Sequence, residues 1–468
     1  MPALFVSESP AVAVRGLHLD LKGVPPAPKR LGGLLKVIAA ARYNALLVEW
    51  EDMFPWTVDE RFRCETAYTP QQVRDFATAA GDLGLEIIPL VQCLGHMETP
   101  LSVSGYESLR EVSCFSDCLN PLAGGARELV EKMVLDVLAL LPGVKRFHLG
   151  GDEAWRFGSH TDTKAFIARH GKAALYLHHV EPLLDLLAAR GIRPILWSDM
   201  MHDWPAKGLQ AIAKKADLCP WGYGGHPDEW TQHHSASRYI ARFHENGVAL
   251  WGACAYKGAD GHDADLPRLD AREANSLAWA QVAQRYGMKG VFATAWSRYS
   301  THRMQNEPID GCLDALVICG AALHEGKADP GRLAAALALL DSLGERGGFE
   351  ACKQALFELA DARKWGWGEV RRLREQIALE TADARRRACG AACGYLRDLK
   401  RHLGVGAAGA VAKARAAFAG RLEPIWLERY LSDRLEPLME ELGSLEPRVR
   451  MLEPEAYEAE YGDASGGL

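Results

Sequence analysis

The sequence contains no long apolar run and no leader-like start. No segment reaches the roughly 18 consecutive apolar residues that a membrane-spanning helix needs. The first ten residues, MPALFVSESP, show no basic stretch followed by an apolar one, which is the pattern of a secretory signal. We therefore expect a cytoplasmic protein that makes no membrane contact.

An excess of one charge is also missing. The 468 residues include 61 acidic and 54 basic side chains, and the formal net charge is −7. This balance provides no extended basic surface, so we expect no nucleic-acid partner. Apolar residues make up 48% of the chain and charged residues 25%, as is usual for a globular protein.

Motifs for metals and cofactors are absent too. The eleven cysteines have no regular spacing, which favours reduced thiols. Cys114 and Cys118 stand four positions apart, but no second pair follows with the spacing of zinc ligands. No Gly-x-Gly-x-x-Gly follows the first apolar run, which argues against a dinucleotide site. We therefore predict neither a metal nor a cofactor.

Over residues 11–325 the sequence alternates short apolar runs with longer amphipathic stretches such as 31–42 and 126–141. The eight runs are AVRGLHLD, NALLVEWED, LEIIPLVQ, VKRFHLGGDE, IRPILWSD, ADLCPWGY, VALWGACA and GVFATAWS. Nearly continuous apolar strands that alternate with helices are typical of a buried parallel sheet. Eight such units in roughly 300 residues indicate an α/β fold, a (β/α)8 TIM barrel, and fit an open doubly wound sheet less well.

The chain changes character after about residue 326. Segments such as RLAAALALLDSLGERG are rich in Ala, Leu and Arg and have helical periodicity. They predict an all-helical C-terminal domain over residues 330–455, following a barrel domain over residues 11–325. This helical domain carries no catalytic motif. It can pack on the barrel or join two copies of the chain as a homodimer, and the sequence leaves both arrangements open.

Polar residues near the ends of the apolar runs are the candidates for a site, because TIM-barrel sites form at the carboxyl ends of the strands. The candidates in chain order are Arg15, Asp20, Glu51, Asp52, His96, Asp152, Glu153, Trp197, Asp199, Trp221, Tyr223, Trp251, Tyr256, Trp296 and Arg298. Carboxylates, a histidine, arginines and several tryptophans are typical of a sugar pocket, since indole faces cover sugar rings and charged groups bind hydroxyls. The tryptophans suit core filling equally well.

Two of these candidates, Asp152 and Glu153, are adjacent carboxylates. Successive strand residues point to opposite sides of a sheet, so these two can share a pocket only if the chain bends. Gly150 and Gly151 directly precede them, and glycine permits such a bend. We therefore interpret the two glycines and the two carboxylates as one structural unit, in which the glycines allow the bend that brings both carboxylates to one pocket.

Seven motifs carry a resemblance to a known family. They are RGLHLDLKGVPP, EWEDMFPW, IPLVQCLGHME, FHLGGDEAW, LWSDMM, LWGACAYKGA and FATAWSRY, in this order over about residues 12–310. In these motifs the sequence resembles glycoside hydrolase family 20, the β-N-acetylhexosaminidases, and most closely its hexosaminidase D branch. The resemblance implies an exo-acting, retaining hydrolase of β-linked N-acetylglucosamine or N-acetylgalactosamine, in which the 2-acetamido group of the substrate is the nucleophile.

The resemblance also implies roles for most of these candidates. Asp152 would orient the acetamido N–H, and Glu153 would protonate the leaving oxygen and then activate water. His96 and Asp52 would form a relay beside Glu153. The substrate-binding set implied by the resemblance is Arg15 on the 3- and 4-hydroxyls, Tyr256 on the acetamido oxygen, Trp197 and Trp296 around the acetamido group, and Trp221, Trp251 and Arg298 at the rim.

Several alternatives stay open at this point. Arg15 precedes its strand and could instead form a salt bridge at the bottom of the barrel. Asp20 could bind sugar or pair with Lys22. Arg298 stands where many family members have a glutamate, so the preference between gluco and galacto epimers is undecided. For the whole chain, the alternatives are a non-catalytic amino-sugar-binding protein and a metal-dependent barrel hydrolase. A metal-dependent barrel hydrolase is expected to have a His-x-His motif on the first strand, where this sequence has only His18.

Overall fold

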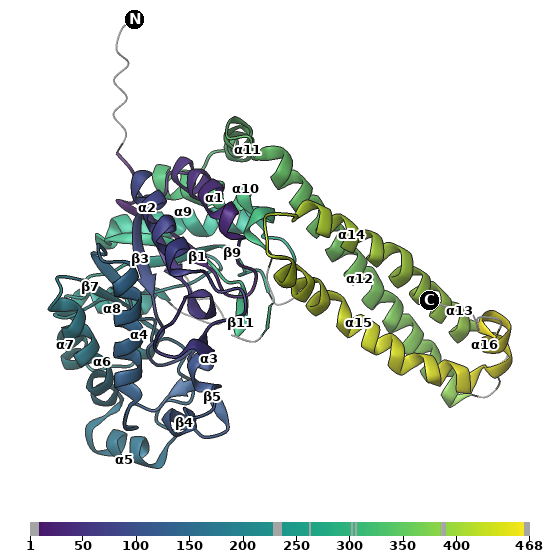
Figure 1. The fold of residues 1–468 in the computed structure, drawn as a ribbon, viewed down its shortest axis with the longest axis horizontal. Coiled ribbons are helices and arrows are strands. Elements are labelled where there is room, and N and C mark those ends of the chain that lie inside the picture. Colours follow the sequence, from purple (N-terminus) through teal and green to yellow (C-terminus); the bar gives the residue numbers. More distant parts are fainter. Residues whose placement is uncertain are drawn as a thin grey trace, which may run out of the picture.

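The eight apolar runs form the eight parallel strands of a barrel (Figure 1). The computed structural model describes residues 9–227, 236–261, 264–300, 303–304, 307–383, 385 and 390–462. The barrel strands are β1 (Val14–Asp20), β2 (Ala45–Glu49), β3 (Glu86–Leu90), β6 (Arg146–His148), β7 (Arg193–Trp197), β8 (Asp217–Cys219), β9 (Gly252–Lys257) and β10 (Gly290–Ala295). Their spatial order is β8-β7-β6-β3-β2-β1-β10-β9.

The two ends of this order are joined, so the sheet closes on itself. Leu218 pairs with Leu250, and Trp221 pairs with Ala253, both in parallel. The backbone N–H of Trp251 donates to the carbonyl of Leu218 at 2.9 Å. The predicted (β/α)8 barrel is therefore confirmed.

A helix follows each barrel strand and covers the outside of the barrel. These helices are α1 (Pro28–Ala40), α2 (Pro70–Asp82), α4 (Ala126–Leu140), α6 (Lys172–Ala188), α7 (Ala206–Ala213), α8 (Ala236–Glu245), α9 (Leu269–Tyr286) and α10 (Leu313–Glu325). Local sequence sets their starts, as in α2, where Thr69 and Gln72 form a capping box and Pro70 occupies the first turn. None of the described helices is both long and apolar enough to cross a bilayer.

Short elements decorate the loops at the carboxyl ends of the strands. After β2 come η1 (Glu51–Met53) and η2 (Glu60–Phe62), and after β3 come α3 (Glu98–Leu101), η3 (Glu107–Leu109) and the hairpin of β4 (Arg110–Val112) and β5 (Phe115–Leu119). The later loops carry α5 (Thr161–His170), η4 (Asp199–Met201), β11 (Arg298–Ser300), β12 (Arg303–Met304) and η5 (Ile309–Gly311). These loops supply much of the candidate site.

The core has two layers because strand side chains alternate between the two faces of the sheet. Leu17 and Leu19 of β1 face the surrounding helices. The barrel interior is a separate cluster of Ala45, Leu47, Ile88, Leu90, Ile195, Trp197, Cys219, Trp251, Ala253 and Phe292. Phe292 lies so close to Gly16 that a Cβ there would be 2.3 Å from its ring, so this position requires glycine.

The C-terminal region is helical, as predicted. Its elements are α11 (Arg332–Ser342), α12 (Arg346–Ala382), α13 (Ala391–Arg401), the π-helical η7 (His402–Ala407), α14 (Ala408–Ala417), α15 (Pro424–Leu452) and α16 (Pro454–Tyr461). The long helix α12 packs along α13, α14 and α15. Together they form a bundle that projects from one side of the barrel (Figure 1). The domain boundaries at 325 and 330 stay predictions.

The base of this bundle is tied to the barrel by buried ion pairs. Asp310 of η5 is fully buried and accepts from Arg30 of α1 at 2.9 Å and from Arg421 at 2.5 Å. Arg30 also pairs with Glu345 at 2.6 Å. Farther along α15, Arg434 pairs with Asp265 of the β9–α9 loop at 3.0 Å. The bundle thus packs on the barrel through charges that are removed from water.

We predict that Asp310→Ala lowers the free energy of unfolding by about 3–5 kcal/mol, because it leaves two arginines in a buried site without their shared carboxylate. Urea denaturation at neutral pH measures this loss. The control is Glu358→Ala, which breaks an exposed pair with Lys413 between α12 and α14 and should cost at most about 1 kcal/mol. Equal losses in the two variants would contradict the buried tether.

Candidate active site

The chain turns sharply after β6, where Asp152 and Glu153 lie. Gly150, Gly151 and Glu153 have φ angles of 58°, 82° and 45°, all in the left-handed region. A Cβ at Gly150 would lie 1.8 Å from Oε1 of Gln92, and one at Gly151 would lie 2.4 Å from the hydroxyl oxygen of Tyr176. Both positions therefore need glycine for backbone conformation and for space, and the chain bends as the sequence predicts.

This turn brings both carboxylates against His96. The Nε2 atom of His96 lies 3.5 Å from Oδ2 of Asp152 and 3.4 Å from Oε2 of Glu153. The Asp152 side chain is only 7% exposed, whereas those of Glu153 and His96 are 29% and 31% exposed. The three predicted residues thus meet at one place, called the hollow below, where Asp152 is buried and the other two are partly exposed to solvent.

Backbone strain is concentrated at this hollow. In the described part of the chain, the non-glycine residues with positive φ are Arg42, Glu51, His96 and Glu153. His96 and Glu153 contact each other, and Glu51 lines a neighbouring cavity. Such conformations cost free energy and persist where the surrounding structure enforces them, which is frequent at functional sites.

The carboxylates determine the charge of His96. Burial alone would lower the pKa of the imidazole, but the charge of Asp152, together with contacts to Asp152 and Glu153 and the charge of Glu98, raises this pKa well above its ordinary value. His96 is therefore an imidazolium at neutral pH. It places a positive charge and an N–H donor between the two carboxylates.

A cluster of aromatic side chains, called the aromatic wall below, lies near these carboxylates, whose charges act on its member Tyr223. Trp197 and Trp296 lie with ring centroids 6.3 Å apart, and Tyr223 lies 6.1 Å from Trp296. Trp221 stacks on Tyr223 at 5.3 Å. The indole nitrogens of Trp197 and Trp296 are buried and have no hydrogen-bond partner among the described residues. Three predicted tryptophans thus come together, with two N–H donors still available for a ligand.

Tyr223 is one of the strand-end candidates, but the resemblance gave it no role. Burial and the charges of Asp152 and Glu153 raise the pKa of its hydroxyl well above the ordinary value, so the hydroxyl stays protonated near the carboxylates. Its position carried a signal, because it follows Trp221 by two residues and such residues share a face in extended backbone.

A buried cluster of charges lies at the ends of β1 and β2. The Nζ atom of Lys22 lies 3.0 Å from Asp20 Oδ1 and 2.7 Å from Glu49 Oε2. It also lies 5.5 Å from the ring centroid of Trp296. Burial opposes the charge of Lys22, but Asp20 and Glu49 raise its pKa, so it stays protonated. Asp20 is therefore an ion partner of Lys22, one of the two roles open from the sequence, whereas Lys22 and Glu49 were missed as site candidates.

The structure contradicts the predicted sugar contact of Arg15. Its guanidinium donates to the main-chain carbonyls of Val12, Ala13 and Arg42 at 2.7–3.0 Å. These carbonyls lie at the amino end of the barrel, opposite the carboxylates. Arg15 also shares its strand face with Leu17 and Leu19, which point away from the barrel interior.

Trp251 and Tyr256 are likewise not at the site. Trp251 is fully buried in the barrel interior, stacks on Phe292 at 4.8 Å, and donates to Asp217 at the start of β8 at 3.0 Å. Tyr256 is also fully buried, on the opposite strand face, and belongs to the core between the barrel and the helices with Cys319 of α10. Strand alternation turns the Tyr256 side chain outward, so neither residue can contact a substrate in the hollow.

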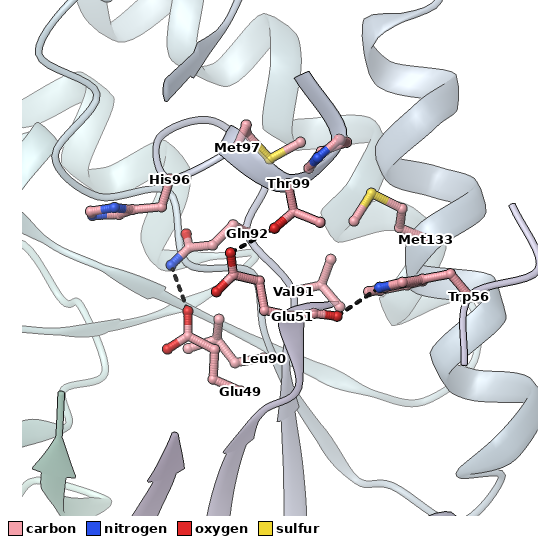
Figure 2. A pocket seen from close by; sticks show the side chains of 11 residues that line it. Glu49, Glu51, Trp56, Leu90, Val91, Gln92, His96, Met97, Thr99 and Met133 are labelled. Carbon is pink, nitrogen blue, oxygen red and sulfur yellow. Dashed lines mark hydrogen bonds between the residues drawn. The ribbon is translucent and has the colours of Figure 1, made fainter. Parts of the chain in front are cut away.

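A cavity borders the hollow beside His96, and Figure 2 shows the side chains that line it. The carboxylate of Glu51 accepts from Thr99 at 2.7 Å, and the main-chain carbonyl of Glu51 accepts from Trp56 at 2.7 Å. Glu51 is therefore the lining carboxylate from η1. Asp52, the next residue, is half-buried, and its relay with His96 stays a prediction.

Two further points concern the predicted set. Arg298 opens β11, but its side chain lies outside the described residues. No group of three or more His, Cys, Asp or Glu residues suited to a metal ion occurs in the part of the chain that the structure describes.

Known proteins resemble this chain in both sequence and fold. The glycosyl hydrolase family 20 catalytic domain matches residues 15–223. Hexosaminidase D of Bos taurus is 32% identical over 324 residues, which cover 67% of this chain and 92% of the bovine protein. Hexosaminidase D of Homo sapiens is 32% identical over 335 residues, or 69% of this chain and 68% of the human protein. A Flavobacterium johnsoniae chitobiase structure shares the fold, with a TM-score of 0.54 at 15% identity over 95% of this chain and 78% of that chain.

We predict that Asp152→Asn lowers the pKa of His96. The substitution removes the charge that raises this pKa most, while the burial that lowers it remains. Titration of the histidine Cε1–H signals by NMR measures the shift, and His96→Gln assigns the signal. Glu98→Gln should lower the pKa less, because its charge is a smaller contribution. An unchanged His96 pKa in Asp152→Asn would contradict this electrostatic assignment.

Proposed function

The chain belongs to glycoside hydrolase family 20, and we propose that it is an exo-acting, retaining β-N-acetylhexosaminidase that removes terminal non-reducing N-acetylglucosamine or N-acetylgalactosamine from carbohydrates. The observation that carries the proposal is the shared hollow of Asp152, Glu153 and His96 beside an aromatic wall. The hollow offers an acid, an orienting carboxylate and apolar faces for a sugar ring.

In the first step, the carbonyl oxygen of the 2-acetamido group attacks carbon one, and the bond from carbon one to the leaving oxygen breaks. Glu153 gives its proton to that oxygen. Asp152 accepts a hydrogen bond from the acetamido N–H, which orients the group and stabilises the positive charge of the cyclic oxazolinium ion. Two carboxylates across the scissile bond are not needed, because the substrate supplies the nucleophile.

In the second step, the Glu153 carboxylate takes a proton from water, and the water oxygen attacks carbon one. The oxazolinium ring opens and the acetamido group is restored. Each step inverts the configuration at carbon one, so the product keeps the β configuration. His96 contributes a positive charge beside the Asp152 carboxylate, and we propose that Asp52 acts with His96 as a relay.

The aromatic wall and Lys22 supply substrate binding in this proposal. Trp197 and Trp296 enclose the acetamido group, and Trp221 covers the rim. The Tyr223 hydroxyl, which stays protonated near the carboxylates, donates to the acetamido oxygen in place of Tyr256. Lys22 binds ring hydroxyls in place of Arg15, and Arg298 contributes to the choice between epimers.

The helical region offers a surface for a homodimer, which we include in the proposal. Phe357 and Trp365 on α12 are 56% and 46% exposed. Covering such side chains with a second copy would remove apolar surface from water. A monomeric mass in light scattering at micromolar concentration would exclude this dimer. The cytoplasmic location expected from the sequence stays a prediction.

We predict that Glu153→Gln and Asp152→Asn each lower kcat for nitrophenyl N-acetyl-β-hexosaminides by about 10²–10⁴-fold, because each removes a group that acts in the transition state. Glu131→Gln, a substitution on the surface of α4, is the control and should leave kcat unchanged. Wild-type rates in both site variants would overturn the assignment. Sugar binding without turnover in the wild type would instead favour a non-catalytic sugar-binding protein.

A second prediction compares Tyr223, which lies near the carboxylates, with Tyr256, whose side chain faces the outer core. Tyr223→Phe should lower kcat by about 10²-fold, because it removes one preorganised donor to the oxygen on which charge changes. Tyr256→Phe should change kcat little, since the Tyr256 hydroxyl has no hydrogen-bond partner among the described residues and faces the outer core. Steady-state kinetics on the same substrates decide the matter. The reverse result would restore Tyr256 to the site.

A further inference from the structure

Asp199 is a third carboxyl group at the hollow, and the proposed mechanism does not use it. It opens η4 directly after β7. Its Oδ2 atom accepts the backbone N–H of Glu153 at 2.9 Å. Glu153 has a φ of 45°, a conformation that a non-glycine residue adopts only under constraint. Asp199 is therefore one of the groups that hold the Glu153 main chain in its left-handed turn.

The second carboxyl oxygen of Asp199, Oδ1, lacks a hydrogen-bond donor among the described residues, and so does Oδ1 of Asp152. Both Oδ1 atoms are also closed off from solvent. A buried acceptor without a donor costs free energy, typically about 1–3 kcal/mol. Two carboxylates with like charge also repel each other in such a place. A single proton between the two carboxyl groups would remove both penalties.

The surroundings favour Asp199 as the holder of that proton. Removal from solvent, and then the charge of Asp152, raise the pKa of Asp199 to about 7. Two other titratable side chains face this region, Tyr176 of α6 and Cys93 after β3. Burial raises the pKa of the Tyr176 hydroxyl and of the Cys93 thiol, so both are neutral at pH 7 and add no charge.

Asp152 is in a different position, because a cation lies beside it. Nε2 of His96 stands 3.5 Å from Oδ2 of Asp152, so a positive charge faces this carboxylate. By contrast, the charged side chains that act on Asp199 are those of Asp152 and Glu153, and both are acidic. The proton shared between the two aspartates therefore belongs on Asp199, on the side away from His96.

We propose that Asp199 is a positioning residue that stays protonated at neutral pH and donates a hydrogen bond to Oδ1 of Asp152. Through this bond it fixes the Asp152 carboxylate with Oδ2 directed into the hollow, and through its second oxygen it fixes the Glu153 main chain. The effect on turnover rests on the proposed function, whereas the shared proton does not.

The proposal gives Asp199 a defined pH dependence. Its folded-state pKa is raised, so the stability that it contributes is fully present below the ordinary carboxyl pKa and is lost as pH rises to about 7. Above that pH the ionised Asp199 repels Asp152 and no longer orients it. Activity should therefore decline on the alkaline side, with a midpoint near pH 7.

The substitution Asp199→Asn tests this directly, because an amide can accept from Glu153 and donate to Asp152 at every pH. We expect kcat at pH 6 to stay within about threefold of the wild type and the alkaline decline to move to higher pH. Asp199→Ala, which loses both bonds, should lower kcat at least about tenfold while KM changes less. The exposed Asp203→Asn is the control and should leave the pH profile unchanged. An unmoved alkaline limb in Asp199→Asn would overturn the proposal.

A second measurement does not need activity. The urea midpoint of the wild type should fall relative to that of Asp199→Asn between about pH 4 and 7 and run parallel above pH 7. Parallel midpoints over the whole range would overturn the shared proton. If the wild type proved inactive on hexosaminides, this comparison would still decide the matter, so the two failures are distinguishable.

Infrared spectroscopy covers the case in which Asp199→Asn does not fold. In Glu153→Gln the acid proton of Glu153 is gone, so a protonated-carboxyl band from this site at pH 6 must come from the aspartates. We expect that band to be present at pH 6 and to disappear as pH rises, with a midpoint at or just below about 7, because this variant lacks the Glu153 charge that helps to raise the pKa of Asp199. Absence of the band at pH 6 would contradict the proposal.

Discussion

The left-handed turn that follows β6 is the constraint on which the site depends. Two successive residues of a strand would point to opposite faces, yet Asp152 and Glu153 both lie within 3.5 Å of His96. The turn is possible because Gly150 and Gly151 tolerate positive φ and leave room for Gln92 and Tyr176. It is held by two hydrogen bonds to Gly151, whose N–H donates to Gln92 at 3.2 Å and whose carbonyl accepts from Tyr176 at 3.1 Å.

Around this turn the barrel arranges opposite charges in a low-dielectric interior. The imidazolium of His96 faces the two carboxylates, and at the ends of β1 and β2 the charge of Lys22 is balanced by Asp20 and Glu49. The same Asp20 accepts the backbone N–H of Ser297 at 2.7 Å, which fixes the chain next to Trp296. The helical bundle reaches this end of the barrel as well, because the Arg421 carbonyl accepts from Ala27 in the loop after β1 at 2.8 Å. The site is thus supported from several strands and from the C-terminal helices.

The sequence predicted the barrel and the carboxylate turn because both depend on local pattern. Eight apolar runs imply eight strands, and a glycine pair before two acids implies a bend. It failed for Arg15 and Tyr256 because a motif match says nothing about strand face, and their side chains lie with the outward set. Trp251 faces the barrel interior but lies too far below the carboxyl ends of the strands to reach the site. No local sequence pattern encodes the height of a residue along the barrel axis. Tyr223 was among the strand-end candidates but had no assigned role, and Lys22 was within reach, since it stands two residues from Asp20.

The central claim is that this turn presents its carboxylates to an acetamido group that itself attacks carbon one. The most direct measurement is the inhibition constant of a thiazoline analogue, in which sulfur replaces the ring oxygen of the proposed oxazolinium intermediate. We expect the thiazoline to bind at least about 10²-fold more tightly than the substrate, as transition-state analogues do, and we expect Asp152→Asn to abolish the difference. Binding no tighter than that of free N-acetylglucosamine, unaffected by Asp152→Asn, would contradict it.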